Sequence, residues 1–146
     1  MYVQGQQVLS AEELDVSNVG GVWLSGFHFA RNAAKLAKLN IGAVVSALEL
    51  HFDYSQLNPE RLVLNIEDDP SENIIKHLDD VYNFIERQRE RTNVLVHCAA
   101  GISRSSALLI GYLIRKYGMT YDQAEEHLRQ RRRIIKPNPG FQKQLR

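Results

Sequence analysis

The segment HCAAGISRS, residues 97–105, decides the fold of this chain. An apolar run over residues 94–96 precedes it, and an apolar helical pattern over residues 107–110 follows it. A strand, a tight loop and a helix start together form a cradle for anions, because backbone N–H groups and the positive end of the helix dipole face the loop. The same field stabilises a cysteine thiolate. The segment therefore predicts that a nucleophile and a phosphate site coincide, as phosphoryl transfer through a cysteine requires.

Length and composition predict a single domain over residues 1–146, with residues 1–20 as a possible lead-in segment. The chain is 44% hydrophobic and 24% charged, which is ordinary for a globular protein. A net charge of +1 gives no indication of nucleic acid, and we see neither a run long enough for a membrane span nor a signal peptide. The single cysteine excludes an internal disulfide. We expect a reducing compartment, the cytoplasm or the nucleus.

Alternating strand and helix patterns predict an α/β fold with a central, mostly parallel sheet of about five strands flanked by helices. The site is then expected at the carboxyl ends of the strands, in the phosphate-binding loop between a strand and a helix. Strands are expected within the first twenty residues and at 22–24, 41–47, 61–66 and 92–97. Helices are expected at 27–39, at 74–85 with Ser71 as N-cap, at 103–117 ended by Gly118, at 120–132 with Thr120 as N-cap, and after Pro137 and Pro139.

The segment resembles the HCxxGxxR(S/T) signature of the cysteine-dependent protein tyrosine phosphatases. Nearly the whole chain, from 22–26 to 137–145, is similar to a small, atypical dual-specificity phosphatase without a docking domain. This resemblance implies a protein phosphatase that hydrolyses phosphotyrosine and phosphoserine or phosphothreonine through a phosphocysteine intermediate. Its partners would be phosphoprotein substrates, with kinases as a candidate class, and neither nucleic acid nor a membrane. No cofactor and no metal is expected.

The residues of the segment divide into a nucleophile and a phosphate cradle. Cys98 is the expected nucleophile, and the planar fork of the Arg104 guanidinium can hold two phosphoryl oxygens at once. Gly101 allows the tight turn, where a side chain would crowd the anion. The expected phosphate-binding residues are Ala99, Ala100, Gly101, Ile102, Ser103 and Arg104.

Two polar neighbours of the cradle have both a functional and a structural interpretation. Strand alternation points His97 away from the phosphate. The resemblance implies that His97 supports the loop and that the Ser105 hydroxyl hydrogen-bonds the Cys98 sulfur and helps it leave. The alternatives are a packing histidine and a first-turn helix serine. Ser103 and Ser106 are interpreted as plain cap or surface residues.

A proton donor for the leaving oxygen is expected in the acidic segment 67–69. The resemblance places the acid about thirty residues before the cysteine, which favours Asp68 and leaves Asp69 as the alternative. The resemblance also matches Asn138 to a position that braces the phosphate loop, although an asparagine between prolines is an ordinary turn. The basic group Arg129, Arg131, Arg132, Arg133 and Lys136 is interpreted as a solvated helix end, or else as a grip for a second phosphate or an acidic partner.

Two other functions compete with a protein phosphatase. A phosphoinositide or RNA-end phosphatase would use the same chemistry, but loop positions 99, 100, 102 and 103 carry none of the basic side chains that lipid-phosphate relatives use. An inactive phosphate-binding module usually lacks the cysteine or the arginine, and both are present. Phe52 and Tyr54 are candidates for the pocket rim.

Overall fold

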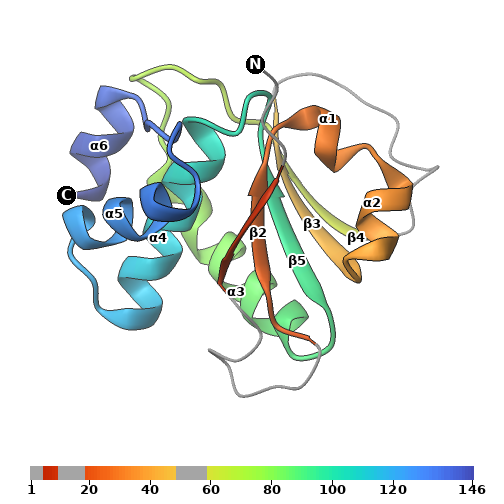
Figure 1. Cartoon of the computed structure of the whole chain (residues 1–146). Coiled ribbons are helices and arrows are strands. Elements are labelled where there is room, and N and C mark those ends of the chain that lie inside the picture. Colours follow the sequence, from red (N-terminus) through yellow and green to blue (C-terminus); the bar gives the residue numbers. More distant parts are fainter. Residues whose placement is uncertain (1–4, 10–18, 49–58) are drawn as a thin grey trace.

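The computed structural model describes residues 5–9, 19–48 and 59–146, so Phe52 and Tyr54 lie outside the described residues. A five-stranded sheet, with strand order β1-β2-β5-β3-β4, forms the centre of the molecule (Figure 1). The strands are β1 (Gln6–Leu9), β2 (Val22–Ser25), β3 (Ile41–Ala47), β4 (Glu60–Leu64) and β5 (Asn93–His97). Among the described strands, only the β1–β2 pairing is antiparallel. The predicted mostly parallel sheet is thus confirmed, with β4 ending earlier than expected.

Strand β5 is apolar on both faces because helices cover both sides of the sheet. Val94 and Val96 belong to the larger core cluster with α3 (Leu78–Arg89) and α4 (Arg104–Tyr117), whereas Leu95 packs in the smaller cluster under α1 (Phe27–Ala30) and α2 (Ala33–Lys38). Figure 1 shows α1 and α2 on one side of the sheet and α3 to α6 on the other. This packing fixes the end of β5, where Cys98 follows.

Two predictions about helices are wrong. Segment 27–39 forms two short helices, because the backbone of Asn32 is extended and its side chain accepts the Lys35 backbone N–H at 3.1 Å as the N-cap of α2. Ser71 caps no helix: its N–H and hydroxyl donate to Asp69 Oδ1 at 2.8 and 2.6 Å. The helical stripe instead begins with a 3₁₀ turn, η2 (Ile75–His77), which continues into α3.

The helices after the sheet begin and end as predicted. Gly118 ends α4 in the left-handed conformation, with φ of 67°. Thr120 and Gln123 form a capping box at the start of α5 (Tyr121–Arg131), and α6 (Pro139–Leu145) closes the chain. Among the described residues, no helix has both the length and the apolar character needed to cross a membrane.

Candidate active site

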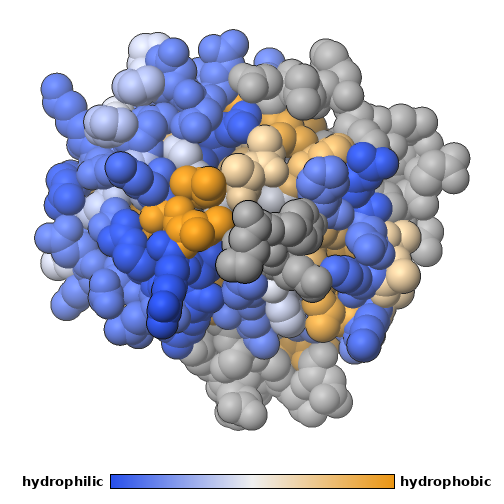
Figure 2. All heavy atoms as spheres, turned by 45° about the horizontal axis from the view of Figure 1, so that its top comes forward, coloured by the Kyte–Doolittle hydropathy of each residue, from blue (hydrophilic) through white to orange (hydrophobic). Residues whose placement is uncertain are grey.

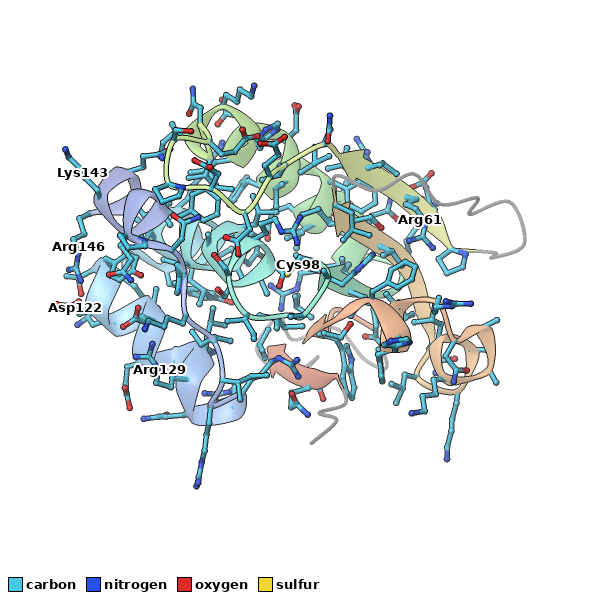
Figure 3. The ribbon with its side chains drawn as sticks, turned by 90° about the horizontal axis from the view of Figure 1, so that it is seen from above. Arg61, Cys98, Asp122, Arg129, Lys143 and Arg146 are labelled. Atoms are coloured by element: carbon cyan, nitrogen blue, oxygen red, sulfur yellow. The ribbon has the colours of Figure 1, made fainter. Side chains whose placement is uncertain are left out.

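The loop between β5 and α4 lies at the carboxyl end of the sheet, as predicted. Cys98 follows β5 directly and is 2% exposed. Viewed from above, Cys98 lies near the middle of this edge (Figure 3). Gly101 has φ of +70°, and a Cβ there would lie 2.6 Å from the Ser25 carbonyl carbon. Glycine is therefore required both by the backbone conformation and by the close approach of β2.

The carbonyl oxygens of residues 98–103 all accept hydrogen bonds from groups that surround the loop, at 2.7 to 3.2 Å. In a trans peptide the C=O and N–H bonds point in opposite directions, so the amides of residues 99–104 face the inside of the loop. This arrangement has the geometry expected of the predicted anion cradle, and phosphate binding by these amides stays a prediction. The donors at these distances, one for each carbonyl from residue 98 to residue 103, are His97 Nδ1, Phe27 N, Arg132 Nη2, Arg132 Nε, Lys136 N and Ala107 N. Ser106 Oγ is a second donor to the last two carbonyls.

The positive end of the cradle is Arg104, the first residue of α4. It is 7% exposed, and its Nη1 donates to the carbonyl of Ile66 at 3.1 Å. That carbonyl comes just before the acidic segment 67–69, so Arg104 connects the phosphate loop to the loop that carries the proposed proton donor.

The Cys98 sulfur has a hydroxyl partner. Cys98 Sγ and Ser105 Oγ lie 3.2 Å apart, and Ser105 is fully buried in the first turn of α4. A hydroxyl at this distance can donate to a thiolate. The contact that the resemblance implies is therefore present, and the role of Ser105 in releasing the sulfur stays a prediction.

His97 belongs to a buried hydrogen-bond chain behind the loop. Its Nδ1 lies 3.2 Å from the Cys98 carbonyl oxygen, which can only accept, so Nδ1 carries the proton. Its Nε2 then accepts from Ser46 Oγ at 2.7 Å, and Ser46 Oγ accepts from Arg61 Nη1 at 2.8 Å. Burial, supported by the charges of Arg61 and Arg104, lowers the pKa of His97 to about 4. Neutral His97 is thus placed to support the loop.

This burial predicts a pH-dependent stability. Between pH 6.5 and 4 the unfolded chain binds a proton at residue 97 that the folded chain does not bind, so folded stability falls as the pH falls. His97 accounts for roughly 3 kcal/mol of that loss. Urea unfolding at pH 7 and pH 4 should show a smaller loss in His97→Asn than in the parent protein. Equal losses in both proteins would contradict the assignment.

The two candidate acids make different contacts. Asp69 Oδ1 accepts both bonds from Ser71, and these hydrogen bonds lower the pKa of Asp69, which makes it a poorer proton donor. Asp68 Oδ1 instead accepts from Asn138 Nδ2 at 3.0 Å. Asn138 also lies against the phosphate loop, so the geometry favours Asp68.

Asn138 joins three parts of the site. Its N–H donates to Ser103 Oγ at 2.9 Å, its Nδ2 holds Asp68, and its Oδ1 caps α6 by accepting from Phe141 N at 2.9 Å. The predicted brace therefore contacts the phosphate loop through its backbone N–H, whereas its side chain contacts the acidic segment and α6.

Sequence reasoning missed the burial of three polar residues here. Ser103 and Ser106 are 7% and 0% exposed, so neither is a surface residue, although Ser103 occupies the predicted cap position at the start of α4. Ser106 Oγ donates to the carbonyls of Ile102 and Ser103, at 2.6 and 3.0 Å. Arg132 is 3% exposed and donates to the loop, which contradicts its interpretation as part of a solvated face. Helical spacing places Ser106 on one face with Leu109, Ile110 and Leu113, which could have shown that Ser106 is buried. Nothing in the sequence distinguishes Arg132 from its neighbours in the basic group.

The other members of the basic group agree with the interpretation of a solvated helix end. Arg129 pairs with Glu125 at 2.9 Å one turn earlier, and Arg131, Arg133 and Lys136 are exposed. Figure 2 shows a mostly hydrophilic face on the side of α5 and α6, with a small group of hydrophobic residues near the middle. Within the described parts of the chain, no group of three or more His, Cys, Asp or Glu side chains could hold a metal ion.

Comparison with known proteins gives the family. Residues 22–146 match the model of the dual specificity phosphatase catalytic domain. The chain belongs to this family. The matched residues include the loop between β5 and α4, with Cys98 and Arg104.

Relatives match at moderate identity. The chain is 36% identical to protein phosphatase Slingshot homolog 3 of Rattus norvegicus, over 78% of this chain and 18% of the relative. It is 37% identical to MAP kinase phosphatase with leucine-rich repeats protein 3 of Dictyostelium discoideum, over 87% of this chain and 15% of the relative. The chain therefore spans less than a fifth of the length of these two curated relatives.

Solved structures match over most of both chains. The crystal structure of DUSP15 has a TM-score of 0.82 at 31% identity, covering 89% of this chain and 83% of that chain. The human tyrosine phosphatase-like serine/threonine/tyrosine-interacting protein has the same TM-score and identity, covering 97% of this chain and 93% of that chain. The dual-specificity phosphatase domain thus accounts for the described fold.

Proposed function

We propose that this domain hydrolyses phosphotyrosine and phosphoserine or phosphothreonine in proteins through a phosphocysteine intermediate. One observation supports the proposal most strongly. Cys98 Sγ lies 3.2 Å from the Ser105 hydroxyl, within a ring of inward-facing amides. Asp68, tied to the same loop through Asn138, completes the set of groups that the reaction needs.

The reaction has two displacements at phosphorus. In the first, the Cys98 thiolate forms the S–P bond as the ester P–O bond breaks, and the departing alcohol or phenol takes a proton from Asp68. In the second, water forms the new P–O bond as the S–P bond breaks, with Ser105 donating a hydrogen bond to the leaving sulfur and Asp68 taking the proton of the water. The amides and Arg104 bind the equatorial oxygens, where charge is spread in both transition states.

Phosphoproteins are the proposed substrates, and phosphorylated kinases are one candidate class because one relative is named a MAP kinase phosphatase. The side chains at loop positions 99, 100, 102 and 103 are uncharged. A phosphoinositide or an RNA end with further phosphates would therefore find no added cation inside the loop, which favours a monophosphate on a protein.

A second candidate is a phosphate-binding module without turnover. It is suggested by the name of one solved relative, which is called phosphatase-like and an interacting protein. Phosphate release from a phosphotyrosine peptide, a phosphothreonine peptide and a phosphoinositide, measured with the parent protein and Cys98→Ser, separates the candidates. Release from both peptides that is lost in the variant supports the proposal. Release only from the lipid supports the phosphoinositide alternative, and tight peptide binding without release supports the module.

Asp68→Asn tests the proton donor. With a phenol of high basicity as leaving group, kcat should fall by about 10²-fold, because the leaving oxygen must depart as an anion. With an acidic phenol, which leaves readily as an anion, the loss should be much smaller. Asp69→Asn is the matched control and should keep kcat within about threefold with both leaving groups. A selective loss in Asp69→Asn, with Asp68→Asn near the parent value, would reverse the assignment.

A further inference from the structure

Arg132 lies directly after α5, yet its guanidinium is directed into the protein. The residue is 3% exposed, and its backbone N–H ends α5 by donating to the Leu128 carbonyl at 2.8 Å. Its neighbours Arg131 and Arg133 are exposed. Burial of a guanidinium is costly, so it must be offset by specific hydrogen bonds. The contacts of Arg132 therefore indicate what the residue does.

Two of these contacts are with consecutive peptides of the phosphate loop. Arg132 Nε donates to the Gly101 carbonyl at 3.0 Å, and Nη2 donates to the Ala100 carbonyl at 3.2 Å. Each of these carbonyls shares a peptide plane with the next amide, that of Gly101 or Ile102. One planar fork thus sets the direction of two of the six inward-facing amides.

Gly101 is shaped to receive this fork. A Cβ at position 101 would lie 2.7 Å from Arg132 Nη2. The guanidinium can reach both carbonyls because the loop has no side chain at this position. The contacts of Arg132 with the loop therefore depend on glycine at position 101.

The remaining nitrogen of the fork is held by the edge of the sheet. Arg132 Nη1 donates to Gln6 Oε1 on β1. Strand β1 is joined to α5 a second time, because His127 Nε2 lies 2.9 Å from the Val8 carbonyl oxygen. The side chain of Arg132 is thus fixed between β1 and the phosphate loop.

We propose that Arg132 is a positioning residue, which aims the amides of Gly101 and Ile102 at the phosphoryl oxygens and is itself held in place by Gln6. The proposal deepens the proposed function and rests on it, since it assigns two amides of that same phosphate site to a residue outside the loop. Lysine at this position keeps the charge but has no planar fork to hold two carbonyls at once.

The test compares oxyanion binding with stability in Arg132→Lys. Inhibition by tungstate, a phosphate-like oxyanion, is measured against a phosphotyrosine peptide, together with kcat/KM and the thermal midpoint. We expect the inhibition constant to rise about tenfold and kcat/KM to fall about 10- to 100-fold. Arg131→Lys is the matched control and should keep the parent values. An unchanged inhibition constant together with an unchanged kcat/KM would overturn the proposal.

Gln6→Ala is the second variant, and it leaves Arg132 and the loop intact. Loss of the outer contact should raise the tungstate constant about two- to fivefold. If Arg132→Lys does not fold, Gln6→Ala tests the positioning role of Arg132 in its place. A folded Gln6→Ala protein with a lowered thermal midpoint but the parent tungstate constant assigns the contact to stability alone and overturns the proposal. A parent protein without turnover would instead refute the proposed function, and direct tungstate binding by calorimetry would still test Arg132.

Discussion

Cys98→Ser is expected to reduce phosphate release by at least about 10⁴-fold while the domain stays folded. A serine hydroxyl at this position is not ionised at neutral pH, so it is a far weaker nucleophile than a thiolate in the same field. The residue is small and buried beside Ser105, so the substitution changes little volume. Initial rates with a phosphotyrosine peptide measure the loss.

The control for Cys98→Ser is retained binding. The amides and Arg104 remain in place, so the variant should bind a phosphotyrosine peptide with an affinity within about tenfold of the parent KM. Calorimetry measures this affinity, and circular dichroism checks the fold. Residual turnover above a few per cent in a folded variant would exclude Cys98 as the nucleophile.

Arg104→Lys is expected to lower kcat/KM by about 10³-fold. Lysine keeps the positive charge but cannot make two parallel hydrogen bonds to the phosphoryl oxygens. It also loses the geometry by which Arg104 holds the Ile66 carbonyl next to the acid loop. Kinetics with phosphotyrosine and phosphothreonine peptides should show similar losses, because both substrates place the same group in the loop.

Arg115→Lys is the matched control for this substitution. Arg115 lies in the same helix, α4, but pairs with Asp79 at 2.7 Å on an exposed surface. An exposed ion pair contributes little, so the variant should keep kcat/KM within about twofold. If Arg104→Lys also stayed within about threefold, the charge alone would account for phosphate binding.

Local patterns were sufficient to predict most of the fold. The apolar run before Cys98 predicts a buried central strand, and residues 94–96 are fully buried in β5. Gly118 and the capping box at Thr120 predict helix ends because their signals act over one turn. Asn32 is also a local N-cap signal. The helical spacing of apolar residues over 27–39 nevertheless favours one helix across it.

The loop was predictable where it depends on its own residues. The segment HCAAGISRS predicts a cradle because a glycine turn and a helix start act locally. The choice between Asp68 and Asp69 depended on Asn138, which is 70 residues from Asp68 along the chain. Position along the sequence alone does not give such a contact, so the resemblance favoured Asp68 without its physical reason.

Arg132 shows what the sequence could not provide. It lies within a basic group whose charges are typical of a solvated helix end. Its burial follows from the approach of α5 to β1 and to a loop 31 residues away, which is a property of tertiary packing. The same reasoning applies to Ser103, whose partner Asn138 is 35 residues distant.

The central claim, that Cys98 carries the phosphoryl group during turnover, is tested most directly by trapping the intermediate. Ser105→Ala removes the hydroxyl 3.2 Å from the sulfur and should slow the second displacement more than the first. After rapid acid quenching with a phosphotyrosine peptide, mass spectrometry should find one phosphoryl group on the peptide that contains Cys98. An active Ser105→Ala protein that shows a rapid burst of product, with the phosphoryl group on another residue or on none, would contradict the account.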